Sequence, residues 1–384
     1  MEIYLDNAAT TSCYPEVGDL VCKIMCEEYG NPSSLHKKGM EAEGRIKTAK
    51  EEIAQILKVS AKEIYFTSGG TESDNLGIIG TAFANRRRGN RIITTAIEHS
   101  AVKKAMEYLA EEGFEITYLP VDRQGVVDLA ALQNALSKET ILVSIQQVNG
   151  EVGTIQPLAE AAQIVKGYHP DILFHTDGVQ GFAKVPIYPK RLGIDLYSAS
   201  AHKIHGPKGV GFLFAQEKVK IKPQIHGGHQ QNNVRSGTEN VPGIAGFGLA
   251  ARRMMENLTV NRAHVEKLRT QLAQGLAQIE DVVIHGAPIE QNSPYILSVG
   301  VAGVPSEVLL HALEEKGIYV SSGSACASNR KTVSPVLQGM GVTKEYLEST
   351  IRFSFSEFIT QEEIDYTLEI LYNCIPMLRK FTRR

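Results

Sequence analysis

Short apolar runs alternate with longer amphipathic segments from about residue 60 to residue 215. The runs are rich in β-branched and aromatic residues, as strands are, and they read EIYFTS, RIITTAI, EITYLPV, TILVSIQQV, ILFHTD, DLYSAS and GVGFLFA. Between them lie segments with the apolar period of a helix, such as SAVKKAMEYLAEEG and LAEAAQIVKGY. This alternation predicts an α/β fold, with a mostly parallel sheet flanked by helices and with ligands bound beyond the carboxyl ends of the strands.

The pattern changes at about residue 250. One long helical segment, AARRMMENLTVNRAHVEKLRTQLAQGLAQI, is followed by the strand-like run YILSVGV, a helix SEVLLHALEEKG, a strand IYVSSG and a final helix TQEEIDYTLEILYNCIPMLRKF. This order predicts a smaller α+β domain at residues 251–384 and a large domain at residues 16–250. We expect the segment 1–15 to pack with the small domain.

Composition and charge narrow the classes of protein. A chain of 384 residues is longer than a single hydrophobic core usually accommodates, so two domains are expected. The formal net charge of −3 favours neither nucleic acid nor a membrane surface, and we expect neither as a partner. No apolar stretch approaches the roughly 20 residues of a membrane-spanning helix, and no signal peptide is visible. The odd count of five cysteines argues against a disulfide framework, so we expect a cytoplasmic protein.

Three segments at predicted strand ends carry candidate chemistry. In FTSGGTESDN a helix begins near Gly70 and Thr71, where free backbone N–H groups favour an anion such as phosphate. In ILFHTD the carboxyl group of Asp177 follows a buried strand, and in SASAHKIHGPKGVG Lys203 lies beside a glycine-rich turn. Each segment alone also has a simpler interpretation, which is a capped helix start, a turn-capping carboxylate and a surface lysine, respectively.

Together, these three segments fit pyridoxal phosphate. A lysine amine can bind the aldehyde of this cofactor covalently, an aspartate can pair with its ring nitrogen, and a helix start can hold its phosphate. An imidazole stacked on the ring would complete such a site. His99 in TAIEHSAV, which again follows a predicted strand, is the candidate, and its alternative role is to cap the helix that follows.

The sequence resembles the cysteine desulfurases, which belong to aminotransferase class V among the fold-type I pyridoxal-phosphate enzymes. The likeness runs through YLDNAATT, YGNPSSLHKKG, FTSGGTESDN, EHSAV, NGEVGTIQP, HTDGVQ, SASAHKIHGPKGVG, RSGTEN, SSGSAC and IRFSFS. Any one of these motifs is weak, but their order and joint presence are specific. The resemblance implies the fold of the fold-type I transferases, pyridoxal phosphate as the cofactor, and conversion of L-cysteine to L-alanine with transfer of the sulfur.

The resemblance also implies roles for single residues. Lys203 would bind the cofactor and move protons at the substrate Cα, His99 would stack on the ring and act in proton transfer, and Asp177 would hold the pyridine nitrogen. The other cofactor contacts would be Gly70, Thr71, Ser200 and His202 at the phosphate, with Gln180 and Asn149 near the phenolic oxygen. Thr238 of RSGTEN would reach the phosphate of the neighbouring subunit, because family members are homodimers with shared active sites.

The resemblance places substrate chemistry on two further motifs. Arg352 of IRFSFS would clamp the substrate carboxylate with Asn31 and Asn149 nearby, since a guanidinium matches a carboxylate geometrically. Cys326 of SSGSAC would attack the substrate sulfur and become a persulfide, because a thiolate is the nucleophilic form. The sulfur would then pass to an acceptor protein in iron–sulfur cluster assembly, tRNA thiolation or cofactor synthesis.

Other functions stay open beside this interpretation. A selenocysteine lyase or another class V aminotransferase is the alternative enzyme, and Cys326 disfavours an aminotransferase. A catalytically silent relative is disfavoured by the intact Lys203, Asp177 and His99.

Two departures from the family pattern stand out. Gly178 occupies a position where alanine is frequent, which we expect to be harmless, and the ending LRKFTRR lacks the longer tail of scaffold-binding members.

The remaining cysteines and one histidine pair have simpler explanations. Cys22 and Cys26 are four residues apart on a predicted helix and could share a metal, but we expect core packing for them and for Cys374, because cysteine is often a small buried apolar residue. His226 and His229 in HGGHQQ resemble a metal pair, yet the resemblance implies a glycine-rich loop there. No metal is therefore expected.

Overall fold

A seven-stranded sheet forms the centre of the larger part of the molecule. The computed structural model describes residues 2–323 and 333–382. The sheet has the order β2 (Ile64–Thr67), β8 (Gly211–Ala215), β7 (Leu196–Ser200), β6 (Leu173–Asp177), β5 (Thr140–Ser144), β3 (Arg91–Thr95) and β4 (Glu115–Leu119). All neighbours are parallel except β8, which is antiparallel to both β2 and β7. The seven strands lie in the seven apolar runs, so the predicted mostly parallel sheet is confirmed.

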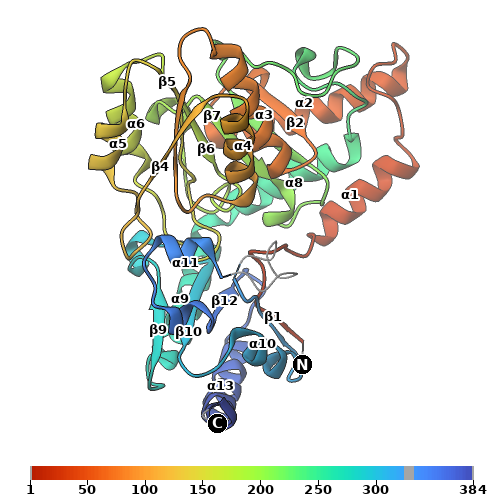
Figure 1. Cartoon of the computed structure of the whole chain (residues 1–384). Coiled ribbons are helices and arrows are strands. Elements are labelled where there is room, and N and C mark those ends of the chain that lie inside the picture. The colour runs from red at the N-terminus through yellow and green to blue at the C-terminus, as the bar shows by residue number, and fades with distance from the viewer. Residues whose placement is uncertain (1, 324–332, 383–384) are drawn as a thin grey trace.

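Helices cover both faces of this sheet (Figure 1). One face packs against α3 (Gly70–Asn85) and α4 (Ser100–Glu111). The other packs against α1 (Pro15–Cys26), α2 (Lys37–Leu57), α5 (Leu129–Ala135), α6 (Leu158–Tyr168) and α8 (Val241–Glu256), with the short α7 (Pro189–Leu192) nearby. Neighbouring strand residues point to opposite faces, so Leu173 joins the first cluster and Phe174 the second. A sheet buried on both faces explains why its strands read as nearly continuous apolar runs.

A three-stranded antiparallel sheet forms a second core. Its order is β12 (Thr350–Ser354), β10 (Ile296–Val301) and β9 (Val282–His285). It packs in one apolar cluster with α9 (Leu258–Leu276), α10 (Ser306–Glu314) and α13 (Gln361–Thr382). The short helices α11 (Pro335–Gly339) and α12 (Lys344–Leu347) complete this part, and α11 packs against Ile97 and Val152 of the larger part.

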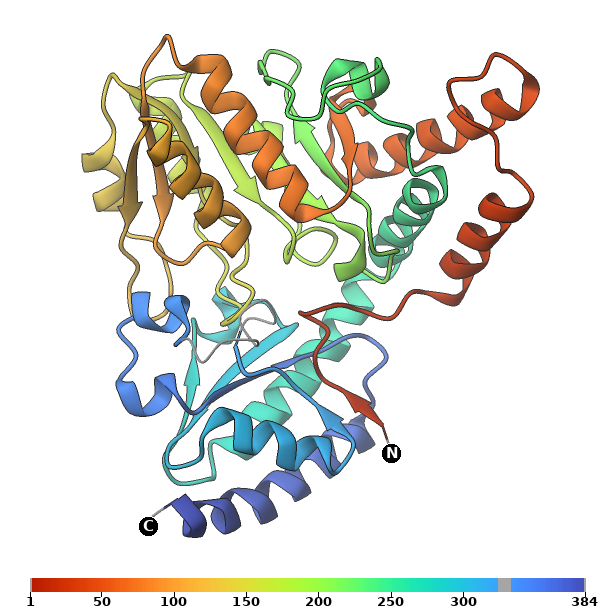
Figure 2. The same ribbon diagram turned by 45° about the vertical axis from the view of Figure 1, so that its right-hand side comes forward.

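The N-terminal segment links the two parts (Figure 2). Its strand β1 (Ile3–Tyr4) pairs in parallel with β11 (Ile318–Tyr319), and Ile3 and Leu5 are buried in the second core. Further along, the Thr11 N–H donates to the His202 carbonyl, 2.9 Å away, in the larger part. The division of the chain after residues 15 and 250 stays a prediction.

One predicted element is wrong. The long helical segment from residue 250 is not continuous, because α8 ends at Glu256 and α9 begins at Leu258. Asn257 lies between them with φ −112° and ψ 9°, outside the helical region, and serves as the C-cap of one helix and the N-cap of the next. Asparagine competes with helical hydrogen bonds through its short amide and favours such caps, whereas the apolar period alone runs straight through it.

Candidate active site

A cavity of about 390 Å³ opens beyond the carboxyl ends of the central parallel strands. Its walls come from the segments that follow β3, β5, β6 and β7, from the start of α3, from the N-terminal segment and from β12 and α11. Every predicted site residue except Asn31, Thr238 and Cys326 lines this cavity. The fold thus brings together residues from position 70 to position 352 at the edge where parallel sheets bind ligands.

The start of α3 offers an anion site on one side of the cavity. Gly70 and Thr71 form the first turn of this 16-residue helix, whose N–H groups and dipole favour negative charge. A Cβ atom added at Gly70 would lie 2.5 Å from Cγ2 of Val179, so a larger residue here would require the Val179 side chain to move. Ser200 and His202, which follow β7, line the same cavity and add a hydroxyl and an imidazole. Burial lowers the pKa of His202 to about 4, which makes it a neutral donor or acceptor.

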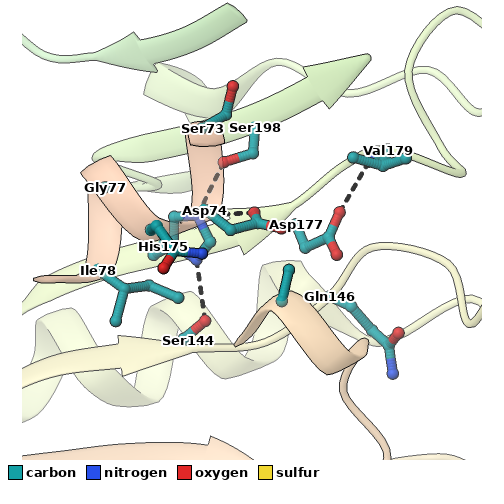
Figure 3. A network of polar contacts seen from close by, with 12 residues as sticks. Ser73, Asp74, Gly77, Ile78, Ser144, Gln146, His175, Asp177, Val179 and Ser198 are labelled. Carbon is teal, nitrogen blue, oxygen red and sulfur yellow. Dashed lines mark hydrogen bonds and ion pairs between the residues drawn. The ribbon is translucent and has the colours of Figure 1, made fainter. Parts of the chain in front are cut away.

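Asp177 ends β6 and is buried at the cavity wall. Its Oδ1 accepts a hydrogen bond from the Val179 N–H at 2.9 Å (Figure 3). Burial raises the pKa of Asp177, while the charges of His99 and Lys203 and the Val179 N–H oppose this rise. A buried carboxyl group that faces cations can hold a positively charged ring nitrogen.

Lys203 ends a short 3₁₀ turn directly after β7. Its Nζ donates hydrogen bonds to the carbonyl oxygens of Ala8 and Ala9, at 2.6 and 2.7 Å. Gln180 donates to the same Ala8 carbonyl at 2.9 Å. The N-terminal motif DNAATT therefore forms one wall of the cavity and holds the amine in place.

His99 both lines the cavity and caps α4. Its Nδ1 accepts a hydrogen bond from the Ala101 N–H at 3.2 Å, so a neutral ring carries its proton on Nε2. The predicted helix cap is therefore confirmed, and the ring lines the cavity, while stacking of His99 on a cofactor stays a prediction. Asn149 is fixed in a similar way, with its Oδ1 accepting from the N–H groups of Glu151 and Val152 and its Nδ2 donating to Ile97.

Arg352 brings a buried cation to the cavity from β12. Its Nη2 lies 2.9 Å from Oδ1 of Asp6, and its Nη1 donates to the Gly150 carbonyl at 2.8 Å. Within the described residues, its Nε has no hydrogen-bond partner. A guanidinium with an unsatisfied buried donor can accept a further anion, such as a carboxylate.

Four titratable residues of the cavity wall were not singled out from the sequence: Asp74, Glu98, Lys103 and Glu151. Burial raises the pKa of Glu98 to about 8 and also raises that of Glu151, which accepts a short hydrogen bond from Ser334. Glu98 directly precedes His99 at a predicted strand end, and that position was a usable signal. Asp74 and Lys103 lie inside helices, where a charged residue usually indicates a solvent-facing position.

Three predicted site residues lie elsewhere. Thr238 lines a separate cavity of about 130 Å³, together with Arg235, which forms an ion pair with Glu72. Asn31 lies on an exposed turn, where its Oδ1 accepts from the Ser33 N–H. Cys326 lies outside the described residues. The roles given to these three residues stay predictions.

The other cysteines divide into two groups. Cys374 is buried in the second core, as predicted. Core packing is wrong for Cys22 and Cys26, which are exposed on α1, because the buried face of this helix carries Val17 and Ile24 instead. Among residues 2–323 and 333–382, no group of three or more His, Cys, Asp or Glu side chains is arranged to hold a metal ion.

The glycine at position 178 is matched by its neighbour on β7. A Cβ atom at Gly178 would lie 1.9 Å from Cζ of Tyr197, which is fully buried. The hydroxyl of Tyr197 donates to Gln147 at 2.6 Å. The Tyr197 side chain therefore fills the space that a methyl group at position 178 would occupy.

Comparisons with known proteins agree with this architecture. A family model for class V aminotransferases matches residues 3–367. The cysteine desulfurase IscS of Dictyoglomus turgidum is 44% identical over 379 residues, which are 98% of this chain and 95% of that protein. The IscS protein of Methanosarcina thermophila is 43% identical over 99% of this chain and 93% of its own length. A solved NifS-like protein superposes with a TM-score of 0.93 at 40% identity, covering 98% of this chain and 100% of that one.

The chain belongs to the aminotransferase class V family and, within it, to the cysteine desulfurases. These enzymes depend on pyridoxal phosphate, and the residues of the cavity fit this cofactor. One cavity is lined by Gly70, which has no side chain to block the helix start, by the buried carboxyl group of Asp177 and by the amine of Lys203. In the described part of the chain, no helix combines the length and the apolar character of a membrane span.

Proposed function

We propose that this enzyme binds L-cysteine in the cavity, releases L-alanine and keeps the sulfur as a persulfide on Cys326. The observation that carries this proposal is the meeting of Lys203, Asp177 and Arg352 in a single cavity. An amine, a buried acid and a buried guanidinium there match the needs of a cofactor and an amino-acid substrate. The printed names of the relatives, cysteine desulfurase, support the choice of L-cysteine.

The cavity residues would hold the cofactor by its three polar parts. Gly70, Thr71, Ser200 and His202 would bind the phosphate, because they combine a helix start with side-chain donors. Asp177 would pair with the ring nitrogen, Gln180 would reach the phenolic oxygen, and His99 would stack on the ring. When bound, pyridoxal phosphate supplies an electron sink next to the substrate Cα.

Lys203 would bind the cofactor aldehyde and then move protons at the substrate carbons. The carbonyls of Ala8 and Ala9 orient its amine, and the fixed position after β7 keeps it within the cavity. His99 would exchange a proton through Nε2, since its Nδ1 is engaged by the α4 backbone.

Arg352 would receive the substrate carboxylate. Its Nε lacks a partner among the described residues, and Asp6 occupies only Nη2. Burial raises the pKa of Asp6, whereas the charges of Arg352 and Lys203 oppose this rise. Asp6 can therefore take up a proton when a second carboxylate binds the guanidinium of Arg352. Asn149 and Asn31 would contact the substrate from the adjoining segments.

Cys326 would take the sulfur. Its thiolate would attack the substrate thiol sulfur, so that a new S–S bond forms while the Cβ–S bond of the substrate breaks. The electron pair of that bond stays with the carbon, which gains a proton and leaves as alanine. The products balance as one persulfide and one alanine for each cysteine consumed.

The enzyme would act as a cytoplasmic homodimer that delivers sulfur to an acceptor protein. Thr238 would reach the phosphate bound by the second subunit, which agrees with its position away from Lys203 in its own chain. The exposed apolar residues Met25, Tyr29, Leu35 and Met40 on α1, α2 and their connection would be covered by that subunit. The acceptor would belong to iron–sulfur cluster assembly, tRNA thiolation or cofactor synthesis.

The test is the stoichiometry of the reaction with L-cysteine and a reductant. Alanine and sulfide should appear in equal amounts, Cys326→Ala should abolish both while the cofactor stays bound, and Lys203→Ala should lose the covalent cofactor. Cys22→Ala, an exposed cysteine outside the cavity, is the matched control. Full activity of Cys326→Ala on L-cysteine would refute the persulfide route, and a strong preference for L-selenocysteine would identify a lyase instead.

A further inference from the structure

A second carboxyl group lies beside Asp177 at the inner wall of the cavity. Asp74 comes from the second turn of α3 and is 1% exposed, and Figure 3 shows its carboxyl group next to that of Asp177. Both residues line the cavity. Two carboxyl groups this close in a water-poor interior do not both carry a charge at neutral pH, because the second charge has neither solvent nor a cation of its own.

Among the residues that the structure describes, no lysine or arginine forms an ion pair with Asp74. Its Oδ1 is buried without a hydrogen-bond donor among the residues that the structure describes, and the nearest ring nitrogen is His175 Nε2 at 3.6 Å. His175 is fully buried, and burial lowers its pKa to about 3, so its ring is neutral. A charged carboxylate with an unpartnered buried oxygen is costly, whereas a protonated carboxyl group is not.

Ser198, His175 and Ser144 form a chain of uncharged polar groups beside Asp74. The Ser198 hydroxyl lies 3.1 Å from His175 Nε2. Ser198 also interacts with the Asp74 carboxyl group, which lowers the pKa of Asp74 and opposes part of the rise that burial causes. The other ring nitrogen, Nδ1, is hydrogen-bonded to the Ser144 hydroxyl at 2.9 Å. Gly77 of α3 lets the helix approach this chain, since a Cβ there would lie 3.3 Å from the His175 ring.

Asp177 has the better-stabilised charge of the two. It accepts the Val179 N–H, and electrostatic interactions with His99 and Lys203 lower its pKa, whereas the charges of Asp177 and Glu98 raise that of Asp74. Burial, and after it the charge of Asp177, raises the pKa of Asp74 well above its usual range. The other titratable groups around the pair are Glu98 before α4, His175 on β6 and Tyr197 on β7.

We propose that Asp74 is a positioning residue that holds a proton beside Asp177, so that the pair carries a single negative charge and that charge stays on Asp177. The proposal deepens the proposed function, because it rests on Asp177 pairing with the cofactor ring nitrogen. Asp74 and the chain of Ser198, His175 and Ser144 form a neutral support behind the charged group. This arrangement keeps the charge at the cavity wall, where a ring nitrogen can use it.

The protonation of Asp74 can be measured directly on the cofactor-free protein. Infrared spectra at pH 7 should show the carbonyl band of a protonated carboxylic acid that shifts when the protein carries ¹³C-labelled aspartate, and this band should vanish in Asp74→Asn. Glu98→Gln is the matched control, because a band from this buried acid does not respond to aspartate labelling. The absence of any aspartate-sensitive acid band in the unmutated protein at pH 7 would overturn the proposal, whether or not a variant folds.

Cofactor binding supplies the second readout. Asp74→Asn keeps the neutral charge, so the dissociation constant for pyridoxal phosphate at pH 7 should change less than about threefold, which is under ~1 kcal/mol. Its visible absorption should match that of the unmutated enzyme at neutral pH and diverge only at alkaline pH, where Asp74 itself ionises; a purely structural role would not cause that divergence. A loss of affinity above about tenfold at pH 7 would mean that Asp74 carries the charge, against the proposal.

Asp177→Asn separates this proposal from the proposed function. It should weaken cofactor binding strongly, since it removes the charge itself. Unchanged binding in Asp177→Asn would refute the role of Asp177 at the ring and, with it, the positioning role of Asp74, whereas the infrared band of Asp74 would still stand as a property of the cofactor-free protein.

Discussion

At the residue scale, the site depends on side chains whose hydrogen bonds leave one group available for a ligand. His99 uses Nδ1 to cap α4 and keeps Nε2 for the cavity. Arg352 binds Asp6 and Gly150 through its two terminal nitrogens, while Nε has no partner among the described residues. These contacts hold each side chain in position before a ligand arrives, which lowers the ordering cost of binding.

The variant Arg352→Lys tests whether the guanidinium of Arg352 binds the substrate carboxylate. A lysine keeps the positive charge but cannot match a carboxylate with two parallel N–H groups, so we expect KM for L-cysteine to rise by about 30-fold or more, equivalent to ~2 kcal/mol. The dissociation constant for pyridoxal phosphate should change little, as measured by absorbance titration. An unchanged KM would show that the carboxylate binds elsewhere.

The residue scale also shows how far sequence reasoning reaches. Asp177 and Lys203 could be predicted because a polar residue directly after a buried strand must lie at the carboxyl edge of a parallel sheet. Asp74 could not, since its burial follows from the packing of α3 near His175, a contact between segments about a hundred residues apart. The contact of Lys203 with Ala8 and Ala9 involves backbone carbonyls, which carry no signature in the sequence.

At the scale of elements, β6 and β7 are matched to one another at the edge of the site. Gly178 follows β6 and leaves the space that the ring of Tyr197 on β7 occupies. The expectation that glycine is a harmless change came from the single position alone, and the structure adds the paired residue. The break between α8 and α9 at Asn257 is a similar case, because a local cap outweighed a continuous apolar pattern.

Gly178→Ala should therefore destabilise this protein. The added methyl group would overlap the Tyr197 ring, and overpacking of this kind typically costs about 1–3 kcal/mol of unfolding free energy. Urea unfolding of Gly178→Ala, Tyr197→Leu and the double variant forms a cycle in which the double variant should be more stable than the sum of the single changes. Strict additivity would contradict the proposed match.

At the scale of the whole molecule, buried neutral histidines make stability depend on pH. Burial lowers the pKa of His175 to about 3 and that of His285 to about 4, both below the value near 6.5 expected for an unfolded chain. As the pH falls below 6.5, the unfolded chain takes up protons that the folded protein does not. These two histidines should therefore contribute a decrease in the unfolding free energy between pH 6.5 and pH 5, by up to ~1.4 kcal/mol per pH unit for each histidine. The buried acids Glu98 and Asp74, whose pKa values are raised, contribute with the opposite sign, so the share of one histidine is read from the difference between two proteins.

His285→Gln provides the comparison for this pH dependence. The variant should lose one histidine's share of the slope while the share of His175 remains. Urea midpoints at several pH values between 5 and 7 measure the difference. Equal slopes for both proteins would show that His285 binds its proton in the folded state.

The exposed apolar surface at the adjoining ends of α1 and α2 is the expected contact with a second subunit. Leu35 is 98% exposed and Tyr29 is 67% exposed, within a group that includes Met25 and Met40. If a second subunit covers this group, Leu35→Glu should shift the protein toward the monomer in sedimentation experiments. Val260→Glu, at a 71% exposed apolar residue on α9, is the control and should leave the mass unchanged. A Leu35→Glu protein with the same mass as the unmutated one would place the subunit contact elsewhere.

The central claim is that sulfur passes from L-cysteine to Cys326. The most direct measurement is mass spectrometry of peptides after a single turnover with L-cysteine labelled with a heavy sulfur isotope, in the absence of reductant. The account predicts one labelled sulfur atom on the peptide that contains Cys326, in an amount equal to the alanine formed. Alanine formation with the label on Cys22 or Cys26, or with no labelled cysteine, would contradict it.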